Sequence, residues 1–201
     1  MKYFENFPLV LYSFDGTVNS ASLLTNIFTR VEFLQSILTN YSVYYTYNMQ
    51  DHDTFESIAY KYYGDPYRYW IVLFANQIID PQWQWPMNNV VFNNYLAKKY
   101  PDTNIYSTIH SYQKTITQVD NSTNVTTKNI IVIDESTYNS LITGTHTYYL
   151  PTGSVTITTT KEAISIYSYE NDLNESKRHI KLINSIYANS MENQLEDLMK
   201  L

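Results

Sequence analysis

Residues 53–76, DTFESIAYKYYGDPYRYWIVLFAN, constrain the fold more than any other part of the chain. They predict two short helices joined by almost no linker. Asp53 can cap the first turn of the first helix, with Glu56 three residues later reaching back to complete the cap. Gly64 stands where a left-handed residue often ends a helix, and Asp65-Pro66 supplies an acidic N-cap followed by a proline at the first helical position. Two helices joined this tightly must pack on each other or on one neighbouring sheet.

Hydrophobic spacing predicts the elements on either side of this helix pair. Apolar residues recur at helical spacing from Leu24 to Leu38, which predicts a preceding helix. Residues 41–49, YSVYYTYNM, are β-branched and aromatic, as expected for a strand. After the pair, Asn88 or Asn89 opens a short helix that runs to Lys99.

The second half of the chain has a different residue pattern. Residues 101–162 alternate β-forming and polar residues, which predicts a β-rich insertion with turns near 120–127 and 151–153. Residues 163–169 and 177–183 predict a further strand pair. Residues 186–198 predict a final helix whose inner face carries Tyr187, Met191, Leu195 and Leu198.

Together these elements predict an α+β chain in four parts. They are an N-terminal extended arm and helix (1–40), a βααβ core with its following helix (41–100), a β-rich insertion (101–162), and C-terminal strands with a helix that docks on the core (163–201).

Composition excludes several classes of function. The net charge of −6 and the pI near 5.1 argue against a general nucleic-acid binder, because no basic field exists to displace counterions from phosphates. Cysteine is absent, which removes disulfides, thiolate metal sites and cysteine nucleophiles. The four histidines lack the spacing of metal ligands, and the sequence contains neither a glycine-rich phosphate loop nor a nucleophile elbow. We therefore expect no catalytic residue, no metal, no cofactor and no enzymatic activity.

The hydropathy pattern indicates a soluble protein. The N-terminal residues MKYFENFPLVLYSFDG lack the uninterrupted apolar run of a signal peptide. No later run of about 18 apolar residues could span a bilayer. We expect a protein used or assembled in the cytosol, with no membrane partner.

The aromatic residues are candidates for binding. The chain has 21 tyrosines against 8 phenylalanines, which fits either a surface buried against a partner or an Asn/Ile/Tyr-rich genome. Trp83 and Trp85 would face the same side of an extended segment, and Pro86 would stiffen its exit. The two indoles could cover the helix pair as a lid, contact a protein partner or stack on sugar rings.

The strand, the Asp-Thr helix start, Ile58-Ala59 on the inner face and a second helix ending in Asn76 together resemble a LysM module. The resemblance implies a site for N-acetylglucosamine polymers in the loops that follow the first strand and the second helix. Those loops would present Gln50, Asp51, His52, Asp53, Ile79 and Asp80. His52 departs from the pattern, because a LysM module normally has a glycine before Asp-Thr.

A longer resemblance rests on three segments: TNIFTRVEFLQ, YYGDPYRYWIVLFANQIIDPQWQWP and YENDLNESKRHIKLINSIYANSMENQLEDLMK. They lie within residues 25–100 and 163–200 and resemble the baseplate wedge protein of contractile-tailed bacteriophages, a family that embeds a LysM-like fold. The resemblance implies a structural subunit that binds neighbouring wedge proteins and helps to join wedges into a ring. It implies other wedge proteins and the sheath-initiating subunit as partners, and a place in the virion tail baseplate after assembly in the host cytoplasm.

The resulting prediction is an α+β fold: a LysM-like βααβ core with a preceding helix, a β-rich insertion, and a C-terminal strand and helix. The candidate partner contacts are Trp83, Trp85, Pro86, Tyr187, Met191 and Leu195. The alternative is a LysM-type module that binds peptidoglycan, while a cell-wall hydrolase would require a catalytic domain that the sequence does not reveal. The internal position of the module and the altered loop at His52 favour assembly over glycan binding.

Overall fold

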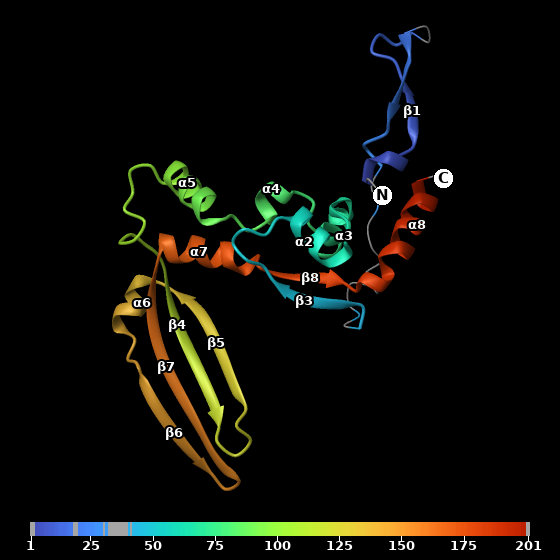
Figure 1. The fold of residues 1–201 in the computed structure, drawn as a ribbon. Coiled ribbons are helices and arrows are strands. Elements are labelled where there is room, and N and C mark those ends of the chain that lie inside the picture. The colour runs from blue at the N-terminus through green and yellow to red at the C-terminus, as the bar shows by residue number, and fades with distance from the viewer. Residues whose placement is uncertain (1–2, 18–19, 30, 32–39, 41, 200–201) are drawn as a thin grey trace. The chain divides into compact units, whose positions relative to one another are not determined.

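The computed structural model describes residues 3–17, 20–29, 31, 40 and 42–199 (Figure 1). The described residues divide into two compact units. Unit 1 comprises the residues up to Val91 together with those from Ser176 onward, and unit 2 comprises Phe92–Glu175. Helices and strands both contribute to the fold, which confirms the predicted α+β class.

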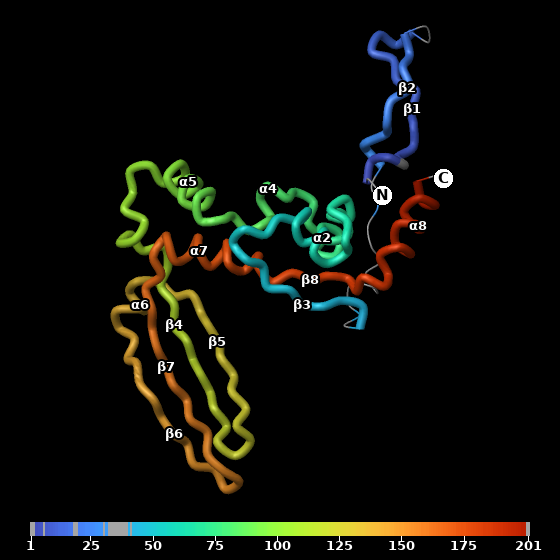
Figure 2. The backbone as a smooth tube through the Cα atoms, viewed as in Figure 1, coloured from blue at the N-terminus to red at the C-terminus, as the bar shows by residue number. Residues whose placement is uncertain are grey.

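A two-stranded antiparallel sheet runs through unit 1. Strand β3 (Tyr44–Asn48) lies beside β8 (His179–Ile183), as Figure 2 shows, and Tyr44 is opposite Ile183. Both strands were predicted, but the strand at 177–183 was expected to pair with 163–169 and instead pairs with β3. The βααβ prediction placed the return strand directly after the second helix, whereas β8 returns only after the whole of unit 2.

The helix pair is formed by α2 (Phe55–Tyr63), the 3-10 turn η3 (Pro66–Arg68) and α3 (Tyr69–Ala75). Gly64 ends α2 with φ of 74°, in the left-handed region that favours glycine, and the side chain of Asp65 accepts from the amide of Tyr67. These features confirm the predicted break.

The predicted cap of α2 is wrong. Thr54 is the N-cap, and it forms a reciprocal capping box with Ser57. Asp53 does not cap because its carboxylate binds groups in the interior of unit 1.

The interior of unit 1 lies between the helix pair, the sheet and the C-terminal helix. The 3-10 turn η4 (Ser185–Tyr187) leads into α8 (Ala188–Met199), as predicted for this part of the chain. Trp70, Ile71 and Val72 of α3 are almost completely buried. Other members of this core include Ile58, Ala59, Ile180, Leu182, Ala188, Met191, Leu195 and Met199.

The N-terminal part of unit 1 contains η1 (Tyr3–Asn6) and an antiparallel hairpin of β1 (Leu9–Tyr12) and β2 (Ser22–Thr25). The predicted helix from Leu24 to Leu38 is wrong at its start, because Leu24 pairs with Val10 in this hairpin. Most of the remainder of that prediction, residues 30 and 32–39, lies outside the described residues.

Unit 2 is built on a four-stranded antiparallel sheet in the order β5-β4-β7-β6. Its strands are β4 (Ile109–Asp120), β5 (Thr126–Ile133), β6 (Gly144–Leu150) and β7 (Gly153–Ser165). The short helix α6 (Glu135–Ser140) joins β5 to β6, and the strands turn at 121–125 and 151–152, within the predicted turns. The β-rich character of residues 101–162 is therefore confirmed.

Two helices of unit 2 are joined by a buried carboxylate. Helix α5 (Asn89–Lys99), most of which belongs to this unit, was predicted, whereas α7 (Ile166–Ser176) replaces the second half of the strand predicted at 163–169. The Ser165 hydroxyl accepts from the amide of Ser168 and thereby starts the helix. Glu170 of α7 binds Lys99 and the hydroxyl of Tyr100, each at 2.8 Å.

Candidate functional site

Three segments of unit 1 meet at the loops that the sequence identified. The first is the loop 50–53 after β3, the second contains α4 (Pro81–Gln84) and Trp85, and the third is Lys177-Arg178 before β8. The Lys177 Nζ donates to the carbonyl of Trp83 at 2.7 Å. Arg178 forms an ion pair with Asp51 at 3.0 Å. Residues far apart in sequence thus build one surface region, which we call the loop site.

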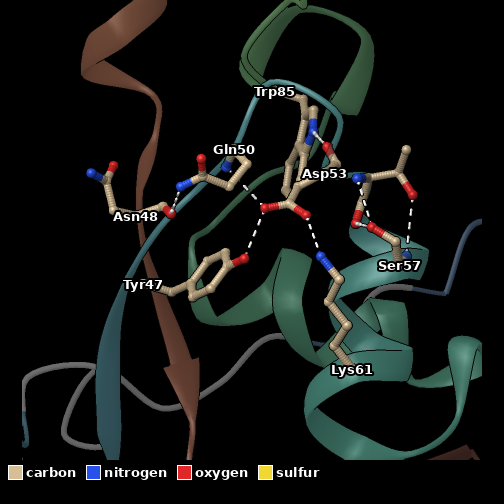
Figure 3. Close-up of polar contacts among 8 residues, drawn as sticks. Tyr47, Asn48, Gln50, Asp53, Ser57, Lys61 and Trp85 are labelled. Atoms are coloured by element: carbon tan, nitrogen blue, oxygen red, sulfur yellow. Dashed lines mark hydrogen bonds and ion pairs between the residues drawn. The ribbon is translucent and has the colours of Figure 1, made fainter.

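Asp53 is the internal anchor of the loop site (Figure 3). Its Oδ2 accepts from the Tyr47 hydroxyl at 2.8 Å and from the Gln50 amide at 2.9 Å. Its Oδ1 binds the Nζ of Lys61 at 2.7 Å, and its backbone carbonyl accepts from the indole Nε1 of Trp85 at 3.3 Å. These bonds join β3, the loop, α2 and the segment after α4, so the loop is held in one conformation.

The environment keeps Asp53 ionised. Burial raises its pKa, but the hydrogen bonds from Lys61, Gln50 and Tyr47 and the charge of Lys61 outweigh burial, so the pKa is lowered overall. The side chain of Asp53 is 0% exposed, whereas that of Lys61 is 53% exposed. A buried, ionised carboxylate whose two oxygens already accept from protein groups is suited to fixing a loop rather than to donating a proton.

The two tryptophans do not share a face, which corrects the prediction for an extended segment. Pro81–Gln84 form a short helix, so residues two positions apart point in different directions. Trp85 is 9% exposed and packs edge-on against Phe55, whereas Trp83 is 54% exposed. The lid interpretation therefore holds for Trp85, while Trp83 lies on the surface. Pro86, which follows Trp85 in the sequence and precedes α5, is half-buried.

The remaining residues of the two predicted glycan loops are mostly on the surface. Gln50, Asp51 and His52 are exposed, in contrast to Asp53. Ile79 is 80% exposed, although its backbone amide donates to Oε1 of Gln84. Asp80 is exposed and caps α4 by accepting from the amide of Gln82. Four carboxylates and amides that sequence alone offered for sugar binding thus have structural partners: Asp51, Asp53, Asp80 and Gln50.

The predicted contacts on the C-terminal helix divide between surface and interior. Tyr187 is exposed, but Met191 and Leu195 are buried in the core of unit 1. Their helical spacing therefore marks the face of α8 that packs inward. Leu198, predicted on the same face, is exposed, and Met199 takes its place.

Arg68 joins α8 to the helix pair through an ion pair and hydrogen bonds. Its Nε and Nη2 bind the two carboxylate oxygens of Glu192 at 3.1 and 2.8 Å, and Nη2 also reaches Asn189 at 2.6 Å. The Nη1 donates to the carbonyl of Tyr63, which ends α2. Burial raises the pKa of Glu192, but Arg68 outweighs that effect and lowers it overall.

Sequence reasoning missed the cationic residues that organise these contacts. Lys61 binds the nearby Asp53, whereas Arg68, Lys177 and Arg178 each bind a group distant in sequence, for which no local spacing is a signal. One signal was present for Lys61: it lies on α2 eight residues after Asp53, which stands just before the N-terminus of that helix.

Among the described residues, no three histidine or acidic side chains converge to hold a metal ion. None of the helices in the described ranges combines the length and apolar character needed to cross a bilayer. The site offers an exposed indole, an exposed isoleucine and polar groups on a rigid support, a combination typical of protein contact surfaces.

Comparison with known proteins identifies the family. The family model of base plate wedge protein 53 matches residues 7–201, which is nearly the whole chain. The chain belongs to the base plate wedge protein 53 family. No match is found among curated proteins. As a base plate wedge protein, it is a structural component of the phage tail, which confirms the resemblance to the baseplate wedge family; the match does not test the LysM resemblance.

Proposed function

We propose that this base plate wedge protein binds neighbouring wedge proteins and helps to join adjacent wedges into the baseplate ring. The match to the wedge protein family over residues 7–201 carries this proposal. The proposed place of action is the virion tail baseplate, assembled in the host cytoplasm. The sheath-initiating subunit is a further proposed partner, because it would lie next to a wedge ring.

The loop site supports the proposal because it presents apolar anchors on a fixed backbone. Trp83 and Ile79 are the exposed apolar residues of its α4 segment. Gln84 holds the backbone amides of Ile79 and Asp80 through its Oε1, and Lys177 holds the carbonyl of Trp83. An exposed aromatic anchor that is already ordered loses little conformational entropy on binding, which favours affinity.

The same geometry weighs against glycan binding. Asp53 is the buried carboxylate of the LysM-like loop, and its oxygens accept from Tyr47, Gln50 and Lys61. A sugar hydroxyl would have to displace one of these internal bonds. We retain a LysM-like core as the docking scaffold and not as a carbohydrate site.

A parallel pull-down tests the proposal. Full-length protein is presented to insoluble peptidoglycan and, separately, to the co-expressed products of the tail genes that neighbour its own. We expect capture by tail proteins, no saturable retention on peptidoglycan, and weaker capture for Trp83→Ala. Tyr60→Ala, which removes another exposed aromatic of unit 1, is the matched control. Saturable retention on peptidoglycan, lost when the exposed His52 is changed, would reverse the assignment.

A further inference from the structure

The N-terminal hairpin exposes apolar side chains on both of its faces. In the register of β1 and β2, Leu9 lies opposite Thr25 and Tyr12 opposite Ser22. Because side chains alternate along a strand, one face carries Leu9, Leu11 and Leu23, and the other carries Val10, Tyr12 and Leu24. These six residues are between 40% and 62% exposed.

Charge is almost absent from this segment. Between Glu5 and Arg30 the only charged residue is Asp15. Asp15 is engaged at the turn, where it accepts from the hydroxyls of Ser13, Thr17 and Ser20 and from the amide of Thr17. The strands therefore present an uncharged surface, and the polar groups are concentrated at the tip.

The exposed apolar area of the hairpin, taken over both faces, is comparable to one side of a protein interface. Nine large apolar residues of the hairpin and its flanks are exposed: Leu9, Val10, Leu11, Tyr12, Phe14, Leu23, Leu24, Ile27 and Phe28. At about 200 Å² for a fully exposed large side chain, they present on the order of 1,000 Å². A standard protein interface buries about 800 Å² on each partner.

Unit 1 holds the base of the hairpin in place. Phe7, directly before β1, is buried in the core. The ring of Tyr3 contacts the rings of Phe7, Trp70 and Phe74 at centroid distances of 5.0, 6.0 and 5.5 Å. The amide of Asn26 closes the open end by donating to the carbonyl of Pro8 at 2.8 Å. A contact made by the strands would therefore be transmitted to the core.

We propose that the hairpin inserts into an uncharged apolar cleft with two walls on a neighbouring baseplate protein; this rests on the proposed function. A strand pair that is apolar on both faces has the pattern of strands buried on both faces. An isolated two-stranded hairpin is also marginally stable in water, so burial would stabilise it. A second copy stacked on one face would leave the other face in water. Each strand has 4 residues, whereas a membrane-spanning strand needs about 9–11.

Single cysteines can test the two faces separately, because the chain has no cysteine of its own. Val10→Cys and Leu11→Cys place thiols on opposite faces, and Tyr60→Cys on α2 gives the reference rate for an exposed site. Each full-length variant is labelled with a maleimide, first alone and then in the baseplate assembly formed with co-expressed tail proteins. Thermal melting of the free variants shows whether the fold is retained.

We expect both hairpin thiols to react at a rate close to Tyr60→Cys in the free protein. In the assembly, both thiols should react at least about tenfold more slowly, as in the dry centre of an interface. Protection of one face alone would overturn the two-walled cleft. Slow labelling of both thiols in the free protein would show that the hairpin is covered without a baseplate partner, which would also overturn it.

The labelling experiment separates this inference from the proposed function. If the variants enter the assembly and both thiols remain reactive, the hairpin is not the contact, while the role in assembly stands. If the wild-type protein does not enter the assembly, the proposed function fails and the inference fails with it.

Discussion

Replacement of Asp53 by Asn tests whether the loop site depends on the buried carboxylate. Asparagine keeps the shape of the side chain but has one acceptor oxygen in place of two and adds an NH₂ group that cannot accept. In the structure Asp53 accepts from Tyr47, Gln50 and Lys61. At least one of these donors therefore loses its acceptor and faces another donor.

The cost follows from the bonds that cannot be remade. A hydrogen bond to a charged group contributes roughly 1.5–3 kcal/mol, and leaving a buried donor unsatisfied costs roughly 1–3 kcal/mol. The ion pair with Lys61 adds little to the difference, because the lysine is half-exposed and returns to water. We expect Asp53→Asn to lower the free energy of unfolding of unit 1 by about 2–4 kcal/mol.

Urea unfolding followed by tryptophan fluorescence measures this loss. All three tryptophans, Trp70, Trp83 and Trp85, belong to unit 1, so the signal reports on that unit. The urea midpoint should fall by on the order of 1–2 M with an unchanged m-value. Lys61→Met is the matched control, and we expect a smaller loss because Gln50 and Tyr47 still bind the carboxylate.

The pH dependence provides an independent check. The pKa of Asp53 is lower in the folded protein than in the unfolded chain, where it is about 3.9. Its stabilising contribution is therefore fully present above that unfolded value and is lost as the pH falls through the folded pKa. The difference between wild type and Asp53→Asn should be constant near neutral pH and shrink below about pH 4. A loss smaller than about 0.5 kcal/mol at pH 7, or a difference that grows in acid, would refute the reasoning.

Three further predictions concern other contacts. Trp85→Ala should cost unit 1 about 3–5 kcal/mol in urea unfolding, whereas Trp83→Ala should change its stability by less than about 0.5 kcal/mol; equal losses would contradict the division between lid and surface. Arg68→Lys keeps the charge but removes the two-pronged bond to α8, so hydrogen exchange in α8 should accelerate by roughly tenfold while β3 stays protected. Unchanged exchange would show that core packing alone docks the helix. Glu170→Gln should destabilise unit 2 by about 1–3 kcal/mol, measured by circular dichroism, and its effect should diminish in acid because the pKa of Glu170 is lowered despite its burial. An effect that persists in acid would contradict the ion-pair account.

The helix pair could be predicted closely because its signals are local. Gly64 is needed for a left-handed backbone, and Asp65-Pro66 presets a helix start, so both act through their immediate neighbours. The error at the start of α2 is informative. Thr54 and Asp53 were both chemically suitable caps, and the choice between them depended on Tyr47 and Lys61, which bind the Asp53 side chain.

The candidate site was predicted in part. The sequence selected the loops at 50–53 and 79–80 and the tryptophan segment, and the structure brings loop 50–53, the tryptophan segment and Lys177-Arg178 together. The sequence did not reveal that Trp83 lies on the surface and Trp85 in the interior. Each follows a glutamine, and the short helix α4 is what directs the two side chains apart.

The sequence by itself determined the family, the α+β class, the helix break at Gly64 and the β-rich character of residues 101–162. These depend on short-range spacing, turn chemistry and a pattern of residues that the family shares. Only the tertiary structure decided that β8 pairs with β3, that Asp53 turns inward and that Leu24 joins a hairpin. Each of those outcomes depends on which distant groups are available to bury a side chain or accept a hydrogen bond, and that is a property of the whole fold.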